Sequence, residues 1–198
     1  MIDSEPLWHE IESAVALRHG GHWTTALSHE CIGTGLEHAV VLMRERLGVE
    51  LGIEQGVAEL VSCFIARVGE LDLMPGCREL VDAGYGKVPL GLCSSSAPDL
   101  VRAVLDRFDL SARFAAVVSG ASVAHAKPAP DIFLHAARLL GVAPASCVVL
   151  EDAIAGVAAG RAAGMCVIAV PERHEPRFAE LADYVVRDLH EARALLEL

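Results

Sequence analysis

Hydrophobic positions along the chain follow two different patterns. From Ser4 to about Leu73, apolar residues recur every three or four positions, as in Leu7, Ile11 and Val15. This spacing is typical of helices that bury one face. Glycines interrupt the pattern at intervals, as expected between helices. The first part of the chain is therefore predicted to be a small helical bundle.

From Met74 onward, short apolar runs alternate with helical patterns. Five runs have the length and composition of strands, at 88–93, 114–119, 147–150, 166–170 and 184–186. Between them lie helical patterns at 99–108, 130–140 and 153–163. Apolar strands joined by helices are typical of a parallel sheet covered on both faces. We therefore expect an α/β fold with a doubly wound, Rossmann-like sheet.

Composition narrows the class of protein. A chain of 198 residues with 53% hydrophobic and 22% charged residues is long enough for one globular domain, with or without an insertion. Its formal charge of −11 argues against a nucleic-acid or anionic membrane partner, because phosphate surfaces require clustered cations. No apolar run spans a bilayer, and no secretory signal precedes the helical pattern, so we expect a cytoplasmic protein without a membrane partner.

Cysteine and histidine usage adds little chemistry. The six cysteines include no C-x-x-C pair, and the nine histidines show no zinc-binding spacing. Cys93, Cys147 and Cys166 lie in strand-like runs, so we expect buried, reduced thiols.

Polar residues follow the first three predicted strands. Ser94 begins a run of three serines after the first strand, Lys127 follows the second, and Glu151 and Asp152 follow the third. In a parallel α/β sheet these strand ends meet at one edge, where ligands bind. A hydroxyl, an ammonium and two carboxylates together suit a phosphate with Mg²⁺.

Each of these residues has a structural alternative when taken alone. Ser94 can cap the following helix, and Glu151 with Asp152 can cap the helix after the third strand. Lys127, which precedes a proline, can be a solvated loop lysine. Their order, each at the end of a strand, favours the functional interpretation.

Four stretches carry a resemblance to a known family. K-P-A-P-D-I-F (127–133) is followed by the long stretch 140–165, and L-C-S-S-S (92–96) and P-G (75–76) precede them. Over essentially its whole length, the chain resembles the haloacid dehalogenase-like hydrolases. Within them it is most similar to the branch of helical-cap sugar-phosphate phosphatases and β-phosphoglucomutases.

The resemblance implies roles for the residues at the strand ends. It implies that Ser94, with Ser95 beside it, binds the transferring phosphoryl group of a small phosphorylated substrate. Lys127 would steady the phosphoryl oxygens and the charge of the nucleophile. Asp152 would hold Mg²⁺, and Glu151 would assist in metal binding or support the ligands.

The resemblance also divides the chain. Residues 4–73 would form a mobile helical cap that closes over the substrate. Residues 74–198, with 1–3, would form the Rossmann-like core, in which Asp131 would have a structural role at the start of a helix.

The family's first motif is incomplete in this sequence. In the family, a central strand ends in D-x-D-G-T/V, followed by two apolar residues and D-S-E; residues 1–6 match only the end of this motif. The first of the absent aspartates would be the nucleophile that forms an aspartyl-phosphate, and the second the general acid and base.

The absence of these two aspartates predicts an inactive or incomplete chain. It also predicts a first central strand missing from the sheet, which would leave unpaired edges beside the strands ending at Cys93 and Leu150. We expect both aspartates upstream of Met1, because of a misassigned start; a truncation and a non-catalytic, phosphate-binding relative are the alternatives.

The cap region bears on the substrate. The stretch 32–37 has no arginine where the mutase branch grips a second phosphate, which favours a phosphatase over a phosphomutase. Glu5, Trp8 and His9 are candidate substrate-facing residues; alternatively, Trp8 packs in the cap and Glu5 caps its helix. We expect a monomer or weak dimer.

Overall fold

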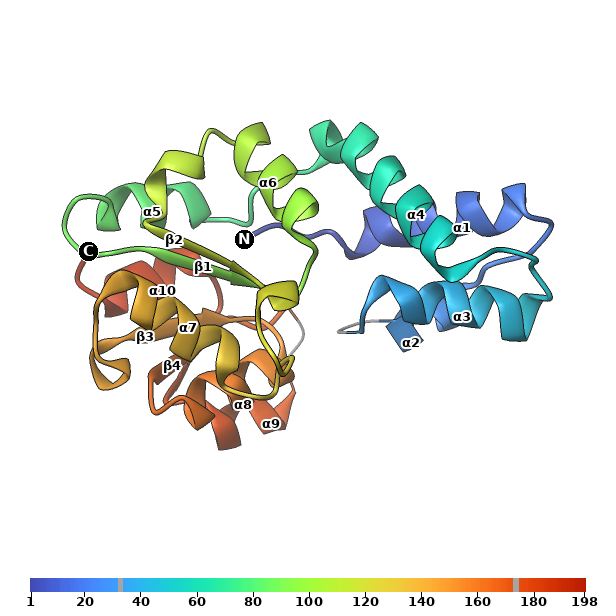
Figure 1. The fold of residues 1–198 in the computed structure, drawn as a ribbon. Coiled ribbons are helices and arrows are strands. Elements are labelled where there is room, and N and C mark those ends of the chain that lie inside the picture. Colours follow the sequence, from blue (N-terminus) through green and yellow to red (C-terminus); the bar gives the residue numbers. More distant parts are fainter. Residues whose placement is uncertain (32–33, 173–174) are drawn as a thin grey trace. The chain divides into compact units, whose positions relative to one another are not determined.

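The computed structural model describes residues 1–31, 34–172 and 175–198. The chain divides into two compact units (Figure 1). One unit is Ile2–Asp72, and the other contains Met1 and Leu73–Leu198.

The first unit is helical, as its apolar spacing predicts. Its elements are α1 (Glu5–Arg18), α2 (Thr25–Cys31), α3 (Leu36–Leu47), α4 (Ile53–Arg67) and the 3₁₀ turn η1 (Val68–Glu70). Helix α4 packs against both α1 and α3, and α2 packs against both α1 and α3. The most deeply buried side chains are apolar ones at helical spacing: Ile11, Val15, Val40, Met43 and Leu60.

The second unit contains the five predicted strands. They are β1 (Gly91–Ser94), β2 (Ala116–Ser119), β3 (Val148–Glu151), β4 (Cys166–Ala169) and β5 (Tyr184–Val185). Every strand pair is parallel, and β1 pairs with β2, β3 with β4, and β4 with β5. The predicted α/β fold class is therefore confirmed.

In the described part of this unit, six helices accompany these strands. They are α5 (Cys77–Gly84), α6 (Pro98–Arg107), α7 (Asp131–Leu140), α8 (Ile154–Ala162), α9 (Pro176–Leu181) and α10 (Leu189–Leu195). Short 3₁₀ turns lie at η2 (Ser111–Arg113), η3 (Gly120–Ser122) and η4 (Pro144–Ser146). The sequence pattern predicts α6, α7 and α8 but not the other three, which have eight residues or fewer and so show too few turns for a clear period.

The sheet is broken between β1 and β3. Strands β1 and β2 form one sheet and β3, β4 and β5 another, and within the described residues no strand joins the two. Such a break is expected where the first central strand is missing. Among these five strands only β4 has a neighbour on each side, and it is the most buried. The expectation of a sheet covered on both faces holds for β4 and for three of the four residues of β2, whereas β1 and β3 are largely half-buried. An edge strand has a neighbour on one side only, and Val117 and Val148 are 44% and 42% exposed.

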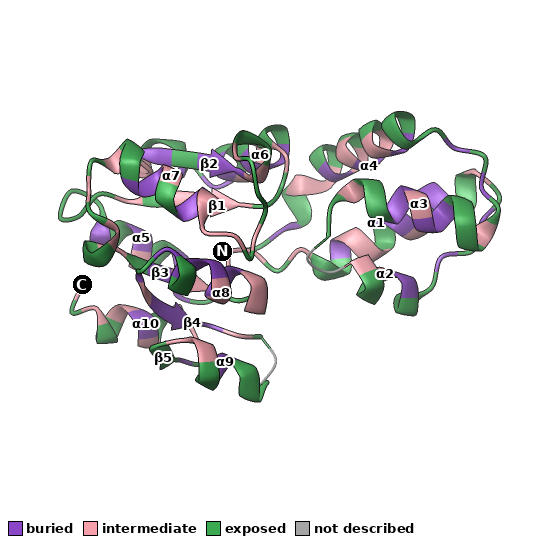
Figure 2. Ribbon diagram, turned by 60° about the horizontal axis from the view of Figure 1, so that its bottom comes forward, coloured by how far each residue is buried: buried purple, intermediate pink, exposed green. Residues whose placement is uncertain are grey.

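Helices hold the two sheets together within this unit. One apolar cluster includes Val118 of β2, Val149 of β3, Phe133 of α7 and Val157 of α8, so it spans the break. Figure 2 shows buried stretches of β2, β4 and α8 in purple. On the opposite face of β4, Ile168 packs with Ala192 of α10, and α10 contacts α5. Alternation along β4 therefore buries both faces of its sheet.

The chain passes from the second unit into the helical unit and returns from it at neighbouring residues. The backbone N–H of Met74 donates to the carbonyl oxygen of Met1 at 2.7 Å. The helical unit, Ile2–Asp72, is thus an insertion whose two ends are tied to the same place.

The six cysteines are free thiols, as expected, but only Cys77 is buried. The expectation of burial is wrong for the other five, which are half-buried. Cys147 precedes β3 and Cys166 opens β4, where the strands begin and the helices cover them less completely. Across the described ranges no helix combines the length and apolar character required to cross a membrane.

Candidate active site

Lys127 and Glu151 form the centre of the candidate site. The Lys127 ammonium makes a short ion pair with Glu151 Oε1 and lies 3.5 Å from the carbonyl oxygen of Cys93. Cys93 is in β1 and Glu151 ends β3, so one side chain reaches the carboxyl ends of both strands beside the break. The side chains of Lys127 and Glu151 are only 11% and 9% exposed. Lys127 is therefore not a solvated loop lysine.

Burial governs the electrostatics of this pair. Loss of hydration raises the pKa of the Glu151 carboxyl, and the Lys127 ammonium partly offsets this effect. The ring of Phe133 lies 5.0 Å from the Lys127 ammonium, in cation–π geometry. Burial also raises the pKa of the Cys93 thiol to about 11, so this cysteine is not an activated nucleophile.

A glycine in α8 makes room for the Glu151 carboxylate. A Cβ atom on Gly156 would lie 2.1 Å from Glu151 Oε2, which is less than any contact that atoms tolerate. Alanine normally suits a helix interior better than glycine by about 1 kcal/mol. The glycine therefore favours the position of the Glu151 carboxylate at the expense of helix stability.

The serines after β1 lie at the same edge of the sheet as Lys127. Helix α6 begins at Pro98, after Ala97, so Ser94 does not occupy the capping position. Instead, Ser94 Oγ accepts a hydrogen bond from the backbone N–H of Ser96 at 3.2 Å. The carbonyl oxygen of Ser96 accepts a hydrogen bond from the Ser119 hydroxyl at the end of β2, at 2.6 Å. This bond connects the serine turn to the neighbouring strand.

Ser95 packs against the residue that follows β2. A Cβ atom on Gly120 would lie 3.2 Å from both the Cα and the carbonyl oxygen of Ser95. The close approach of the two backbones fixes the serine turn beside the start of the lysine loop.

Asp152 follows Glu151 and is exposed at the end of β3. Helix α8 begins after Ala153, so neither acid occupies its capping position. Two adjacent carboxylates suit Mg²⁺, which commonly binds one or two carboxylates together with waters and substrate phosphate. A cage of three or more acidic, cysteine or histidine ligands does not occur among the described residues. The donor set therefore fits a metal shared with a substrate, rather than one enclosed by protein ligands.

A second polar pair lies next to Lys127 in the sequence. His125 Nδ1 is 2.9 Å from Asp131 Oδ1, at the first residue of α7. The hydrogen bond with His125 lowers the pKa of Asp131. Asp131 does stand at the start of a helix, and its partner His125 was not anticipated from the sequence.

The helical unit holds the proposed substrate-facing residues. Glu5 is exposed at the first residue of α1, and its backbone N–H donates to Asp3 Oδ1 at 3.2 Å. Of the stretch 32–37 that lacks an arginine, Ile32 and Gly33 lie outside the described residues.

Trp8 and His9 both have partners within the helical unit. The Trp8 ring stacks on Phe64 with a centroid distance of 4.6 Å, which supports the alternative that it packs in this unit. His9 Nδ1 lies 2.8 Å from Ser28 Oγ.

A buried carboxylate lies behind Ser28. Glu12 is 4% exposed, and its Oε2 atom accepts hydrogen bonds from the Ser28 hydroxyl at 2.7 Å and the Trp23 indole at 2.9 Å. Burial raises the pKa of Glu12. This group was not identified from the sequence, where it reads as an ordinary helical acid.

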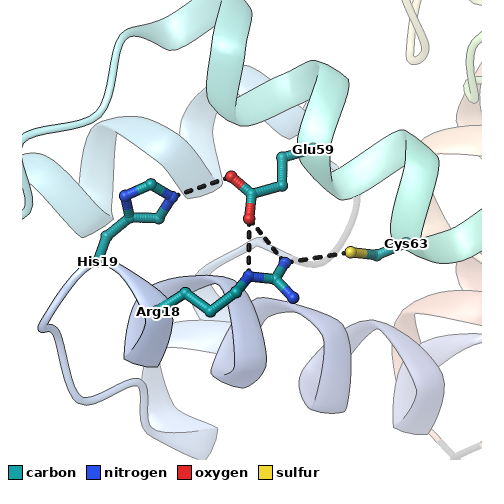
Figure 3. Close-up of polar contacts among 4 residues, drawn as sticks. All are labelled: Arg18, His19, Glu59 and Cys63. Atoms are coloured by element: carbon teal, nitrogen blue, oxygen red, sulfur yellow. Dashed lines mark hydrogen bonds and ion pairs between the residues drawn. The ribbon is translucent and has the colours of Figure 1, made fainter.

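A charged cluster joins the end of α1 to α4 (Figure 3). Glu59 accepts from Arg18 Nε at 2.8 Å and lies 2.9 Å from His19 Nε2, while Arg18 also contacts Cys63 Sγ at 3.2 Å. Although partial burial acts in the opposite direction, hydrogen bonds from His19 and Arg18 lower the pKa of Glu59. The cluster therefore links α1 to α4 within the helical unit.

Comparisons with known proteins identify the family. The sequence profile of the haloacid dehalogenase-like hydrolases matches residues 2–164, so the chain belongs to this family. Hexitol phosphatase B of Escherichia coli K12 is 34% identical over 98% of this chain and 90% of its own length. The β-phosphoglucomutase of Bacillus subtilis is 40% identical over 63% of this chain and 53% of its own length.

Solved structures agree with the fold. The crystal structure of CbbY from Rhodobacter sphaeroides in complex with phosphate superposes with a TM-score of 0.88 at 25% identity, covering 100% of this chain and 95% of that one. The family resemblance inferred from the motifs is therefore confirmed.

Proposed function

We propose that this protein is a Mg²⁺-dependent phosphatase that hydrolyses a small phosphorylated metabolite, in particular a sugar phosphate. The observation that carries the proposal is the buried Lys127 ammonium at the carboxyl ends of β1 and β3, beside the Glu151 carboxylate and the carbonyl oxygen of Cys93. The names of two relatives, hexitol phosphatase B and a fructose-1-phosphate phosphatase, support the substrate class.

In the proposed reaction, Ser94 donates a hydrogen bond to the transferring phosphoryl group, and Ser95 helps to shape the same turn. Lys127 offsets the charge on the phosphoryl oxygens. Asp152, assisted by Glu151, would hold Mg²⁺, which when bound supplies further charge stabilisation to the phosphoryl group.

The nucleophile in this proposal is an aspartate outside residues 1–198, which contain no D-x-D-G motif. It attacks phosphorus to form an aspartyl-phosphate while the alcohol leaves, and a second aspartate protonates the alcohol and then deprotonates the attacking water. The broken sheet supports this arrangement. Within the part of the chain that the structure describes, β1 and β3 each have one unpaired edge, and a parallel strand between them would end beside Lys127.

We propose further that residues 4–73 act as a cap over the core formed by 74–198 with 1–3, with Glu5 facing the substrate. The insertion of Ile2–Asp72 as a separate compact unit supports this role. The expected cytoplasmic location and monomeric or weakly dimeric state remain part of the proposal.

A phosphomutase is the second candidate, and the similarity to β-phosphoglucomutase favours it. The absence of an arginine in 32–37 favours the phosphatase instead. A non-catalytic binding protein is the third possibility.

The test compares the 198-residue chain with a version that carries an N-terminal strand and a D-x-D-G turn before Met1. Both are assayed against hexose and hexitol phosphates, with Mg²⁺ and with a chelator. We expect phosphate release only from the extended version with Mg²⁺, and none when its first aspartate is changed to asparagine. Isomerisation of a sugar phosphate without phosphate release would establish the mutase, and no turnover of any ester would contradict both.

A further inference from the structure

The loop that carries Lys127 is closed by a side-chain bond at its two ends. His125 lies two positions before Lys127, and Asp131 lies four positions after it. Between them, the backbone N–H of Ala129 donates to the carbonyl oxygen of Ala126 at 2.9 Å. The His125–Asp131 contact of 2.9 Å therefore bridges a short turn with Lys127 inside it.

The Asp131 end of this bridge is firmly held. Ile132 and Phe133, the next two residues of α7, are 1% and 6% exposed. The carbonyl oxygen of Ile132 accepts a weak contact from Cys93 Sγ of β1 at 3.8 Å. Asp131 thus stands on a fixed first turn packed against the sheet.

The other end of the loop has few contacts of its own. Ala121, Ser122, Ala124 and Ala126 are exposed, and Val123 is half-buried. Val123 packs against the core cluster of this unit, but Ala124 and Ala126, which are nearer to Lys127, are exposed and provide little packing. The bond to Asp131 is therefore the side-chain restraint nearest to Lys127 on this side.

Lys127 requires such a restraint. Its ammonium must remain against Glu151 and the Cys93 carbonyl in a nearly closed site, where a displacement would leave buried charges unpaired. We propose that His125 is a positioning residue, which holds the Lys127 loop in place by its bond to Asp131. The importance of this role for phosphate binding rests on the proposed function.

The competing interpretation is an ordinary surface ion pair. The His125 side chain is 74% exposed, and exposed pairs contribute little to global stability. The two interpretations differ in where the effect appears: a positioning residue changes the loop and Lys127, whereas an ordinary pair changes neither.

The experiment uses the 198-residue chain and three variants. His125→Ala removes the bond, and His125→Gln keeps an N–H donor that can reach Asp131. His22→Ala is the matched control, since His22 is an exposed histidine of the helical unit. Hydrogen exchange of the Ala129 amide and the NMR signal of the Lys127 ammonium report on the loop, and titration with inorganic phosphate and Mg²⁺ reports on binding.

We expect His125→Ala to accelerate exchange at Ala129 and to broaden or shift the Lys127 signal, with unchanged global stability. Phosphate binding should weaken by up to about fivefold, the effect expected for one exposed pair. His125→Gln should restore the loop signals, and His22→Ala should leave them unchanged.

If the Ala129 amide of His125→Ala exchanges at the same rate as in the wild type, the proposal is overturned, whatever the phosphate titration shows. If the unaltered chain binds no phosphate, the proposed function is weakened, while the exchange measurement still decides whether His125 holds the loop.

Discussion

Replacement of Lys127 by methionine leaves the Glu151 carboxylate buried without its ammonium partner. The side chains have similar volume, so the loss is mainly electrostatic. Removing one partner of a buried pair typically costs about 3–5 kcal/mol. Protonation of Glu151 sets an upper limit to this cost, because the neutral acid tolerates burial. The ordinary pKa of the carboxyl is 4.5, so protonating it at pH 7 costs roughly 3 kcal/mol. We therefore expect Lys127→Met to lower the free energy of unfolding by about 2–3 kcal/mol at pH 7.

The pH dependence identifies the cause. The folded-state pKa of Glu151 is raised, and it should rise further without Lys127, so the acid favours the folded state most below its unfolded value of 4.5. This contribution is lost as the pH rises through the folded value. The deficit of Lys127→Met should therefore shrink between pH 7 and pH 5. In the Glu151→Gln background, Lys127→Met should change the free energy of unfolding by the same amount at both pH values.

These differences in the free energy of unfolding can be measured by urea denaturation at pH 7 and pH 5. A double-mutant cycle of the wild type, Lys127→Met, Glu151→Gln and the double variant then isolates the interaction between the two side chains. A Lys127→Met deficit below about 0.5 kcal/mol at pH 7, within the range of ordinary surface substitutions, would refute the buried-pair reasoning. So would a deficit of equal size at pH 5.

Three further predictions concern single residues. Gly156→Ala should displace the Glu151 carboxylate, because the new Cβ would overlap it, yet change the unfolding free energy by no more than about 1 kcal/mol; NMR of the Lys127 ammonium and urea denaturation separate the two effects. Gly76→Ala should lower the free energy of unfolding by more than about 2 kcal/mol, because Gly76 has a φ of +82° and a Cβ atom there would lie 2.5 Å from the backbone nitrogen of His190. Wild-type stability of this variant in urea would contradict the prediction. Burial raises the pKa of Glu12, so its contribution to folding stability is greatest below pH 4.5 and declines as the pH rises. Glu12→Gln should therefore flatten the dependence of stability on pH between pH 4.5 and 7. An unchanged profile would exclude Glu12 as a source of this pH dependence.

The parts of the fold that depend on apolar patterning could be predicted from the sequence. The runs 114–119 and 166–170 are apolar because β2 and β4 pack against helices, so burial and pattern agree. Helix α9 has only six residues, and its position depends on contacts with α8 and β5, which no local pattern encodes. The apolar run 88–93 did not indicate that β1 is only half-buried, because the number of neighbours of a strand is a property of the whole sheet.

The site could be predicted only as far as topology determines it. Lys127 and Glu151 follow different strands, and the rule that parallel strand ends share one edge brings them together. Gly156 had a detectable signal, a glycine inside a predicted helix, but its purpose depends on the path of the Glu151 side chain. No sequence signal indicates the bond between His125 and Asp131, because it crosses an irregular turn.

The contact between Met1 and Met74 has a consequence for how such a protein can diversify. A unit that enters and leaves at one point can be lengthened, shortened or exchanged without moving the strands that carry the chemistry. Selection can then act on Ile2–Asp72 almost as on a separate gene segment, while Lys127 and Glu151 remain in place. A chimaera that joins this core to another helical unit at Met1 and Met74 should therefore fold with Lys127 and Glu151 still paired.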